Sequence, residues 1–199
     1  MKPEQRDPDI TRGISEVFGV MLILAITIIV AGIIAAFAGG FSFDSSEEAL
    51  SANIVVSGFV VKSDHGHNYA YIIFDHMSGD PVNLNGVEFA LGSRSSSTKR
   101  TVISNRLEPT GWNETGSSLT QYIQGYGAGS VTRIGTGDRF VLYADGWTDE
   151  DEDGVVTWQS HGSSGEFSVK FNDHLTYQII DTRSKRVLSS GMIAVPEPS

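Results

Sequence analysis

The segment VFGVMLILAITIIVAGIIAAFAGGFSF, residues 17–43, decides the fold of this chain. It holds 27 residues without a charged side chain, between Glu16 and Asp44. About 20 apolar residues are enough to cross a bilayer as a helix, so this segment is long enough to span one with some tilt. We therefore predict an N-terminal membrane-spanning helix, followed by a domain that is held at, or released from, a membrane.

Two simpler interpretations of this segment stay open. A cleaved secretory signal has an apolar core of about 7–15 residues, shorter than this one. Ala36-Phe37-Ala38 nevertheless has the small-residue pattern of a signal cleavage site. A plain single-span anchor also fits the length and needs no processing. A third interpretation accounts for more of the residues, and it depends on the sequence just before the helix.

Arg12-Gly13, followed by ISEVFGV at residues 14–20, resembles the cleavage junction of archaeal type IV pilins. In that family a prepilin peptidase cuts after the glycine, on the cytoplasmic side of the apolar helix. The resemblance implies a leader peptide at residues 1–13, a cut between Gly13 and Ile14, and a helix that survives processing. The sequence departs from bacterial pilins in one respect: Glu16 is third after the cut, whereas their glutamate is fifth.

The resemblance also implies a function. It implies a structural subunit of a surface filament involved in adhesion, whose partners are other pilin subunits, the prepilin peptidase and an assembly platform in the membrane. The precursor would lie in the cell membrane, and the mature subunit in a pilus at the cell surface. Residues 74–84, with Gly79-Asp80-Pro81, and residues 179–188 resemble a strand–turn and the closing hairpin of the family. The alternative is a membrane-anchored external binding domain that does not polymerise.

Small residues recur every four positions in the second half of the predicted helix. A spacing of four places them along one helix face, where neighbouring backbones can approach closely. Gly and Ala are common in membrane helices, so composition alone is the simpler explanation. The pilin interpretation predicts that these faces pack one subunit on another in a filament core. The two series are Ala31, Ala35, Gly39 and Gly32, Ala36, Gly40.

After residue 52 the hydrophobic pattern changes from a continuous run to short segments rich in Val, Ile, Phe and Tyr. Turn residues such as Asp64-His65-Gly66 and Asp145-Gly146 separate these segments, as in antiparallel sandwiches. We predict an α+β chain with a leader at 1–13, a hydrophobic helix at 14–52 and an external, all-β antiparallel sandwich-like domain at 53–199. The predicted strands are 53–62, 68–75, 82–91, 139–144, 155–158, 166–171, 175–181 and 186–195, with loops at 93–99 and 125–137.

Charge and composition argue against several classes of function. The net charge is −10, which disfavours nucleic-acid binding because that requires a clustered basic face. The chain has no cysteine, which excludes disulfides, thiolate metal sites and cysteine nucleophiles. No nucleophile elbow or phosphate-binding loop occurs, so we do not expect an enzyme. The Lys/Arg bias across the helix predicts a cytoplasmic N-terminus and an external domain.

The acidic run DEDEDG, residues 149–154, is a candidate calcium loop. It fits D-x-D-x-D-G, in which alternate carboxylates converge on a hard cation. Position 12 of the pattern is Ser160, so the usual bidentate acid is missing, and Asp145 or Glu166 would have to replace it. A solvated acidic turn is the alternative. The predicted Ca²⁺ ligands are Asp149, Asp151, Asp153 and the backbone carbonyl of Val155.

Three further patterns concern the surface of the predicted domain. Asn113-Glu114-Thr115 is an N-x-[ST] sequon, which makes Asn113 a candidate glycan acceptor. His65 and His67 lie in a predicted turn, where a solvent-facing position is favoured over a zinc site. The tryptophans are predicted at the core or at a sheet edge, and two exposed ones would form an adhesive patch. They are Trp112, Trp147 and Trp158.

Overall fold

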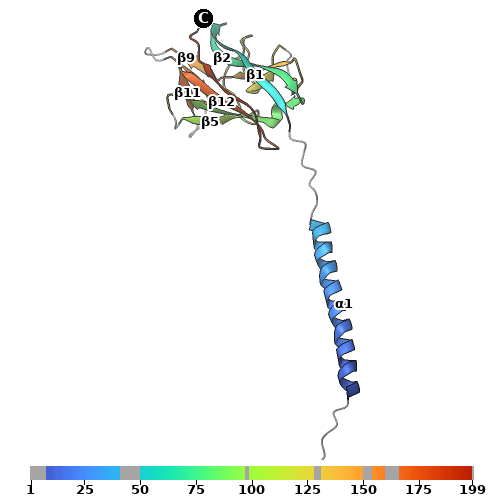
Figure 1. The fold of residues 1–199 in the computed structure, drawn as a ribbon. Helices are drawn as coiled ribbons and strands as arrows, with labels where there is room; N and C mark the ends of the chain where they lie inside the picture. The colour runs from blue at the N-terminus through green and yellow to red at the C-terminus, as the bar shows by residue number, and fades with distance from the viewer. Residues whose placement is uncertain are drawn as a thin grey trace, which may run out of the picture. The chain divides into compact units, whose positions relative to one another are not determined.

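The computed structural model describes residues 8–40, 50–96, 99–127, 131–149, 154–159 and 166–198. The chain divides into two compact units, Met1–Glu48 and Ala49–Ser199, and the second is called the head domain below. The first unit contains the helix α1, and the described part of the head domain consists of strands and one short 3-10 helix (Figure 1). The predicted class, an N-terminal helix followed by an antiparallel β domain, is confirmed.

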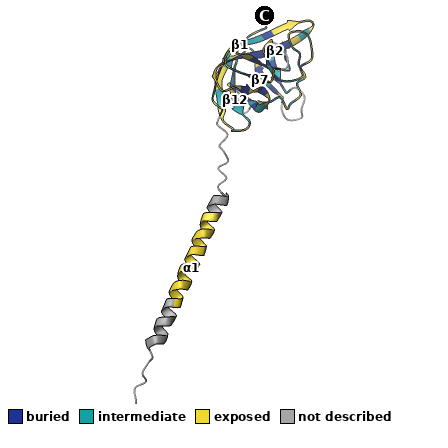
Figure 2. Cartoon of the chain, turned by 90° about the vertical axis from the view of Figure 1, so that its right-hand side faces the viewer, coloured by how far each residue is buried: buried dark blue, intermediate teal, exposed yellow. Residues whose placement is uncertain are grey.

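Helix α1 (Pro8–Gly40) carries residues 17–40 of the uncharged segment. Pro8 lies in its first turn, where the missing N–H breaks no helical hydrogen bond. All residues of Val17–Ala35 are exposed (Figure 2), and this 19-residue stretch is long and apolar enough to cross a membrane. Its one hydroxyl group, on Thr27, donates to the carbonyl oxygen of Leu24 at 2.8 Å. A helix that is apolar all round needs lipid or other helices around it.

The junction between helix and head domain differs from the prediction, which extended the helix to residue 52. Residues 41–49 lie outside the described residues, Leu50 and Ser51 are not helical, and β1 (Ala52–Asp64) begins next. Two hydrogen bonds hold the chain extended here. The Ser51 N–H donates to Asp80 Oδ2 at 3.0 Å, and the Asp80 N–H donates to the Ser51 carbonyl at 2.8 Å. These bonds fix the start of β1 to the turn that follows β2 (His67–Gly79).

The head domain is built on two four-stranded sheets, β1-β2-β8-β6 and β13-β12-β4-β5, in which neighbouring strands are antiparallel. Smaller sheets join β11-β10-β9 and β3-β7. The remaining elements are β3 (Val82–Asn83), η1 (Leu84–Gly86), β4 (Val87–Ser93), β5 (Arg100–Ile103), β6 (Ile123–Gly125), β7 (Arg133–Ile134), β8 (Arg139–Tyr143), β9 (Gly146–Thr148), β10 (Val155–Trp158), β11 (Phe167–Lys170), β12 (His174–Asp181) and β13 (Val187–Ala194).

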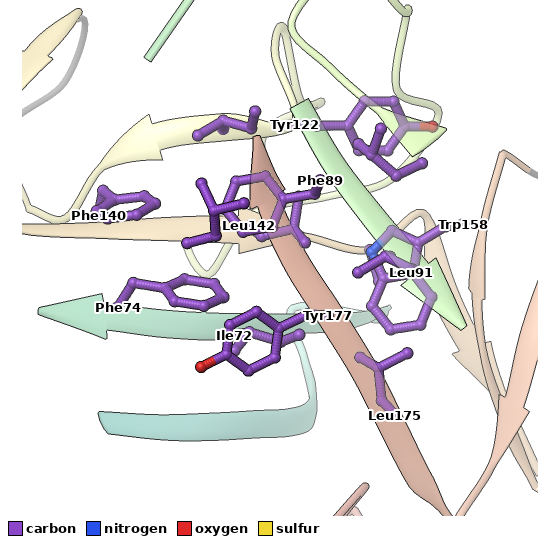
Figure 3. Packing of buried hydrophobic residues seen from close by; sticks show 14 of the residues in the cluster. Ile72, Phe74, Phe89, Leu91, Tyr122, Phe140, Leu142, Trp158, Leu175 and Tyr177 are labelled. Carbon is purple, nitrogen blue, oxygen red and sulfur yellow. The ribbon is translucent and has the colours of Figure 1, made fainter. Parts of the chain in front are cut away.

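Aromatic side chains from both large sheets meet in one core (Figure 3). Phe74 of β2 stacks on Phe140 of β8 with ring centroids 5.2 Å apart. From the opposite sheet, Phe89 of β4 approaches Phe74 to 5.1 Å and Tyr177 of β12 meets it edge-on at 5.4 Å. Alternate residues of β4 are buried, as expected for a strand with one face on a core. The sandwich arrangement is therefore present.

A second hydrophobic cluster covers the other face of β2 and β8. It contains Tyr69, Tyr71 and Tyr143, with Leu119 and Val141 packed among them. Burial raises the pKa of Tyr143 to about 12. Burial, and after it the carboxylate of Glu114, also raises the pKa of Tyr71. Because this face is covered, residues 69–72 are buried on both sides of the sheet rather than alternating.

Seven of the predicted strands are present, and the eighth, predicted at 82–91, is divided into β3, η1 and β4. Four further short strands were not predicted. These are β5, β6, β7 and β9, each two to four residues long. β7 lies inside the segment 125–137, which was predicted to be a loop; Ile134 pairs there with Val82 of β3. A strand of two residues has too few positions to show an alternating pattern, so only its partner defines it.

Candidate functional site

The predicted processing junction lies on helix α1. Arg12, Gly13 and Ile14 have helical backbone, four to six residues after the start of the helix at Pro8. Their side chains lie outside the part that the structure describes. Ser15 and Glu16 separate the junction from the exposed apolar stretch Val17–Ala35. The predicted processing junction and a segment suited to a membrane therefore lie on one helix.

The small-residue faces are only partly described. Ala31, Gly32 and Ala35 are exposed on α1. A Cβ atom added at Gly32 would meet no atom within 4 Å, apart from the local helix backbone. The fold of a single chain therefore does not require a glycine at this position. Ala36, Gly39 and Gly40 have helical backbone, and their side-chain surroundings lie outside the described part.

Helix α1 and the start of β1 are similar in sequence to a known family. Residues 12–54 match the archaeal type IV pilin N-terminal family. The match begins at Arg12, spans the apolar segment and ends at Ile54 in β1. This pilin match supports a pilin subunit, and the family is structural rather than enzymatic. The head domain beyond β1 lies outside the matched residues.

The chain is also similar to a protein whose name gives no function. An uncharacterized protein from Archaeoglobus fulgidus is 31% identical over 86 residues. The alignment covers 43% of this chain and 56% of the relative. The chain therefore matches about half the length of that protein.

The candidate calcium loop is only half described. Asp149 is exposed and Val155 is the first residue of β10, whereas Asp151 and Asp153 lie outside the described residues. Asp145, considered as an extra ligand, accepts hydrogen bonds from the Tyr122 hydroxyl and the Thr110 N–H instead. Within the described ranges, no three His, Asp or Glu side chains come together to hold a metal ion. The calcium site stays a prediction.

The sequon Asn113-Glu114-Thr115 lies in an ordered turn. Asn113 Oδ1 accepts hydrogen bonds from Thr115 N at 3.0 Å, Thr115 Oγ1 at 2.8 Å and Ser117 N at 2.9 Å. These bonds fix the side-chain amide, and they leave its Nδ2 group as the part not engaged by the turn. A glycan at Asn113 stays a prediction, and this geometry is compatible with it.

The tryptophans separate into two environments. Trp158 is fully buried, and its indole N–H donates to the Tyr143 carbonyl at 3.0 Å. Trp112 and Trp147 are half-buried and line one hollow of the head domain. His67, predicted to face solvent, stacks on Trp112 with ring centroids 3.6 Å apart. No sequence signal indicated this contact, because the two residues lie on separate segments that only the fold brings together.

Proposed function

We propose that this chain is the precursor of a structural subunit of an archaeal type IV pilus-like surface filament that serves in attachment. The observation that carries the proposal is the family match over residues 12–54, on a helix whose apolar surface Val17–Ala35 is uncovered in the single chain. A prepilin peptidase removes residues 1–13. The helix then passes from the membrane into a bundle with helices of other subunits.

The physical basis is the need of α1 for an apolar environment. Lipid meets this need in the precursor, and sister helices meet it in a filament. Small side chains let helix backbones approach closely, which increases van der Waals contact where hydrophobic exclusion from water is weak. Ala31, Gly32 and Ala35 supply such a surface within the described helix. The acidic composition of the chain, with net charge −10, favours a soluble external head domain.

Processing is the first test. When the chain is produced together with a prepilin peptidase, mass spectrometry should find a mature N-terminus at Ile14. Gly13→Val should leave the leader attached, whereas Thr27→Val, a change further along the helix, should be processed normally. A chain that retains Met1 in the presence of active peptidase would instead support a membrane-anchored binding domain that does not polymerise.

Assembly is the second test, and Gly32 suits it because a side chain there meets nothing within the chain. Gly32→Leu should leave membrane insertion and the head domain unchanged, but electron microscopy should show few or no filaments. Val30→Leu is the control, since Val30 is also exposed on α1 and lies outside both small-residue series. Normal filaments from Gly32→Leu would contradict packing through this face.

A further inference from the structure

A hollow of about 470 Å³ lies on the head domain where three segments meet. They are the turn between β1 and β2, the loop that contains Trp112, and β9. Its volume falls within the range of about 300–1,000 Å³ that is typical of small-molecule sites. The side chains that matter here are His67, Asn68, Trp112, Asp145, Trp147 and Glu166.

The loop that carries Trp112 is held in place by backbone contacts. A Cβ added at Gly111 would lie 2.6 Å from the Ala144 carbonyl and 2.7 Å from the Asp145 carbonyl, so only glycine permits this approach. Just before it, the Thr110 N–H donates to Asp145 Oδ1 at 2.8 Å. Beyond it, Trp112 forms a β-bridge with Ser118. These backbone contacts therefore fix the position of Trp112.

The aromatic rings of the hollow are also fixed. His67 and Trp112 stack with an angle of 12° between their planes. The Trp147 indole N–H donates to the Lys62 carbonyl at 2.8 Å, and its ring meets Phe171 edge-on at 5.9 Å. Rigid aromatic side chains lose little conformational entropy when a ligand packs on them. The hollow thus offers two preorganised indole groups.

Polar groups stand beside these rings. Asn68 donates from Nδ2 to the Trp147 carbonyl at 3.0 Å, which orients its amide and leaves Oδ1 as an acceptor. Glu166 is exposed at the rim and contributes a second acceptor. With Asp145, it gives the hollow two carboxylates, which disfavour an anionic ligand. The six residues include no lysine or arginine. Flat apolar surfaces next to acceptors match a ligand that has both C–H faces and hydroxyl groups.

We propose that this hollow binds a neutral carbohydrate, with a pyranose ring packed on the indole groups and its hydroxyls donating to Asn68 and Glu166. The biological role of this binding rests on the proposed function, because a filament would bring the hollow to the surface to which the cell attaches. The binding itself requires only the head domain. It gives the attachment role a ligand class, and it excludes sugars that carry carboxylate or sulfate groups.

The test is isothermal titration calorimetry on the full chain in a polyoxyethylene detergent, because a maltoside detergent would itself present sugar. The probes are cellobiose, mannobiose, lactose and diacetylchitobiose, with digalacturonate as the acidic match and choline as a cationic one. At least one neutral disaccharide should bind saturably. Trp112→Ala should weaken that binding at least tenfold, and Asn68→Ala several-fold. Tyr126→Ala, a 40% exposed aromatic residue outside the hollow, should leave it unchanged.

Each outcome is decisive. Absence of saturable binding by all four neutral probes overturns the proposal, as does undiminished binding by Trp112→Ala, or tighter binding of digalacturonate or choline. If Trp112→Ala lowers the melting temperature, the exposed substitutions Asn68→Ala and Glu166→Gln decide the question. Wild-type filaments combined with no sugar binding refute this inference alone. Sugar binding by a chain that never assembles refutes the filament function alone.

Discussion

Replacing Gly79 with alanine tests the point at which the chain enters the head domain. Gly79 has a φ of +105°, and left-handed backbone costs an L-residue about 1–2 kcal/mol. An added Cβ would also collide with the carbonyl oxygen of Ser51 and lie 2.9 Å from the Cα of Ala52. Since both are backbone atoms, a side-chain rotation cannot relieve the clash, and the start of β1 must move.

Moving Ser51 breaks its two hydrogen bonds with Asp80, one at 2.8 Å and one at 3.0 Å. Each contributes about 1 kcal/mol, and exposure to water keeps the carboxylate bond from contributing more. Together with the backbone strain, Gly79→Ala should lower the free energy of unfolding by about 3–4 kcal/mol. Gly66→Ala is the matched control, because Gly66 has a φ of +79° and open space around it. It should cost only the strain, about 1–2 kcal/mol.

The measurement is urea unfolding of the full chain in detergent micelles, followed by tryptophan fluorescence and extrapolated linearly to water. Trp158 reports the core because it is fully buried. The two variants should differ by about 2 kcal/mol, the part assigned to Ser51 and Asp80. Equal losses of unfolding free energy in Gly79→Ala and Gly66→Ala would refute a contribution of the Ser51–Asp80 hydrogen bonds to stability.

Three other outcomes are expected. His76 is fully buried, and neither ring nitrogen has a hydrogen-bond partner among the described residues. His76→Leu should therefore raise the free energy of unfolding by about 1 kcal/mol, and a loss would reveal a partner. Burial raises the pKa of Tyr143 to about 12, above the value near 10 of an unfolded chain, so stability should be constant below pH 10 and fall as the pH rises toward 12. An absorbance titration at 295 nm should accordingly show Tyr143, Tyr71 and Tyr122 un-ionised until unfolding, and ionisation of all six tyrosines near pH 10 in the folded protein would contradict this. Thr115→Ala should remove any glycan from Asn113 and lower the mass of the cell-surface protein by more than the side-chain change, whereas Thr115→Ser keeps the sequon and the glycan. A mass difference equal to the threonine-to-alanine change alone would exclude occupancy.

The helix and the longer strands were predictable because their signals are local. An uncharged run of 27 residues and alternating segments such as β4 need no knowledge of distant parts of the chain. The end of the helix was not predictable to the residue. Ser51 is held extended by Asp80, which lies 29 positions further along the chain. β7 was missed for a related reason, since two residues form a strand only through the pairing of Ile134 with Val82.

The candidate sites also divide into those with a local sequence signal and those that only the fold assembles. The junction Arg12-Gly13-Ile14 is a contiguous motif, and the family match begins at its first residue. The hollow is assembled from segments around His67, Trp112, Trp147 and Glu166, so its composition depends on the sheet order. Burial of His76 is likewise a tertiary property, because a polar residue in a strand gives no sign by itself of which face will be covered.

The pairing of β1 with β2 has a mechanical consequence. The two strands pair from Ala52↔Gly79, next to the covalent link with α1, to Asp64↔His67, at the edge of the hollow. Tension between the helix and a ligand held near His67 would run along the strand axis, a length of about 40 Å at ~3.3 Å per residue. The backbone of β1 itself joins these two points, so covalent bonds would carry the load and the ladder hydrogen bonds, which are perpendicular to that axis, would not be opened one after another. A head domain pulled along the axis of β1 should withstand more force than one whose strands separate one hydrogen bond at a time from an end.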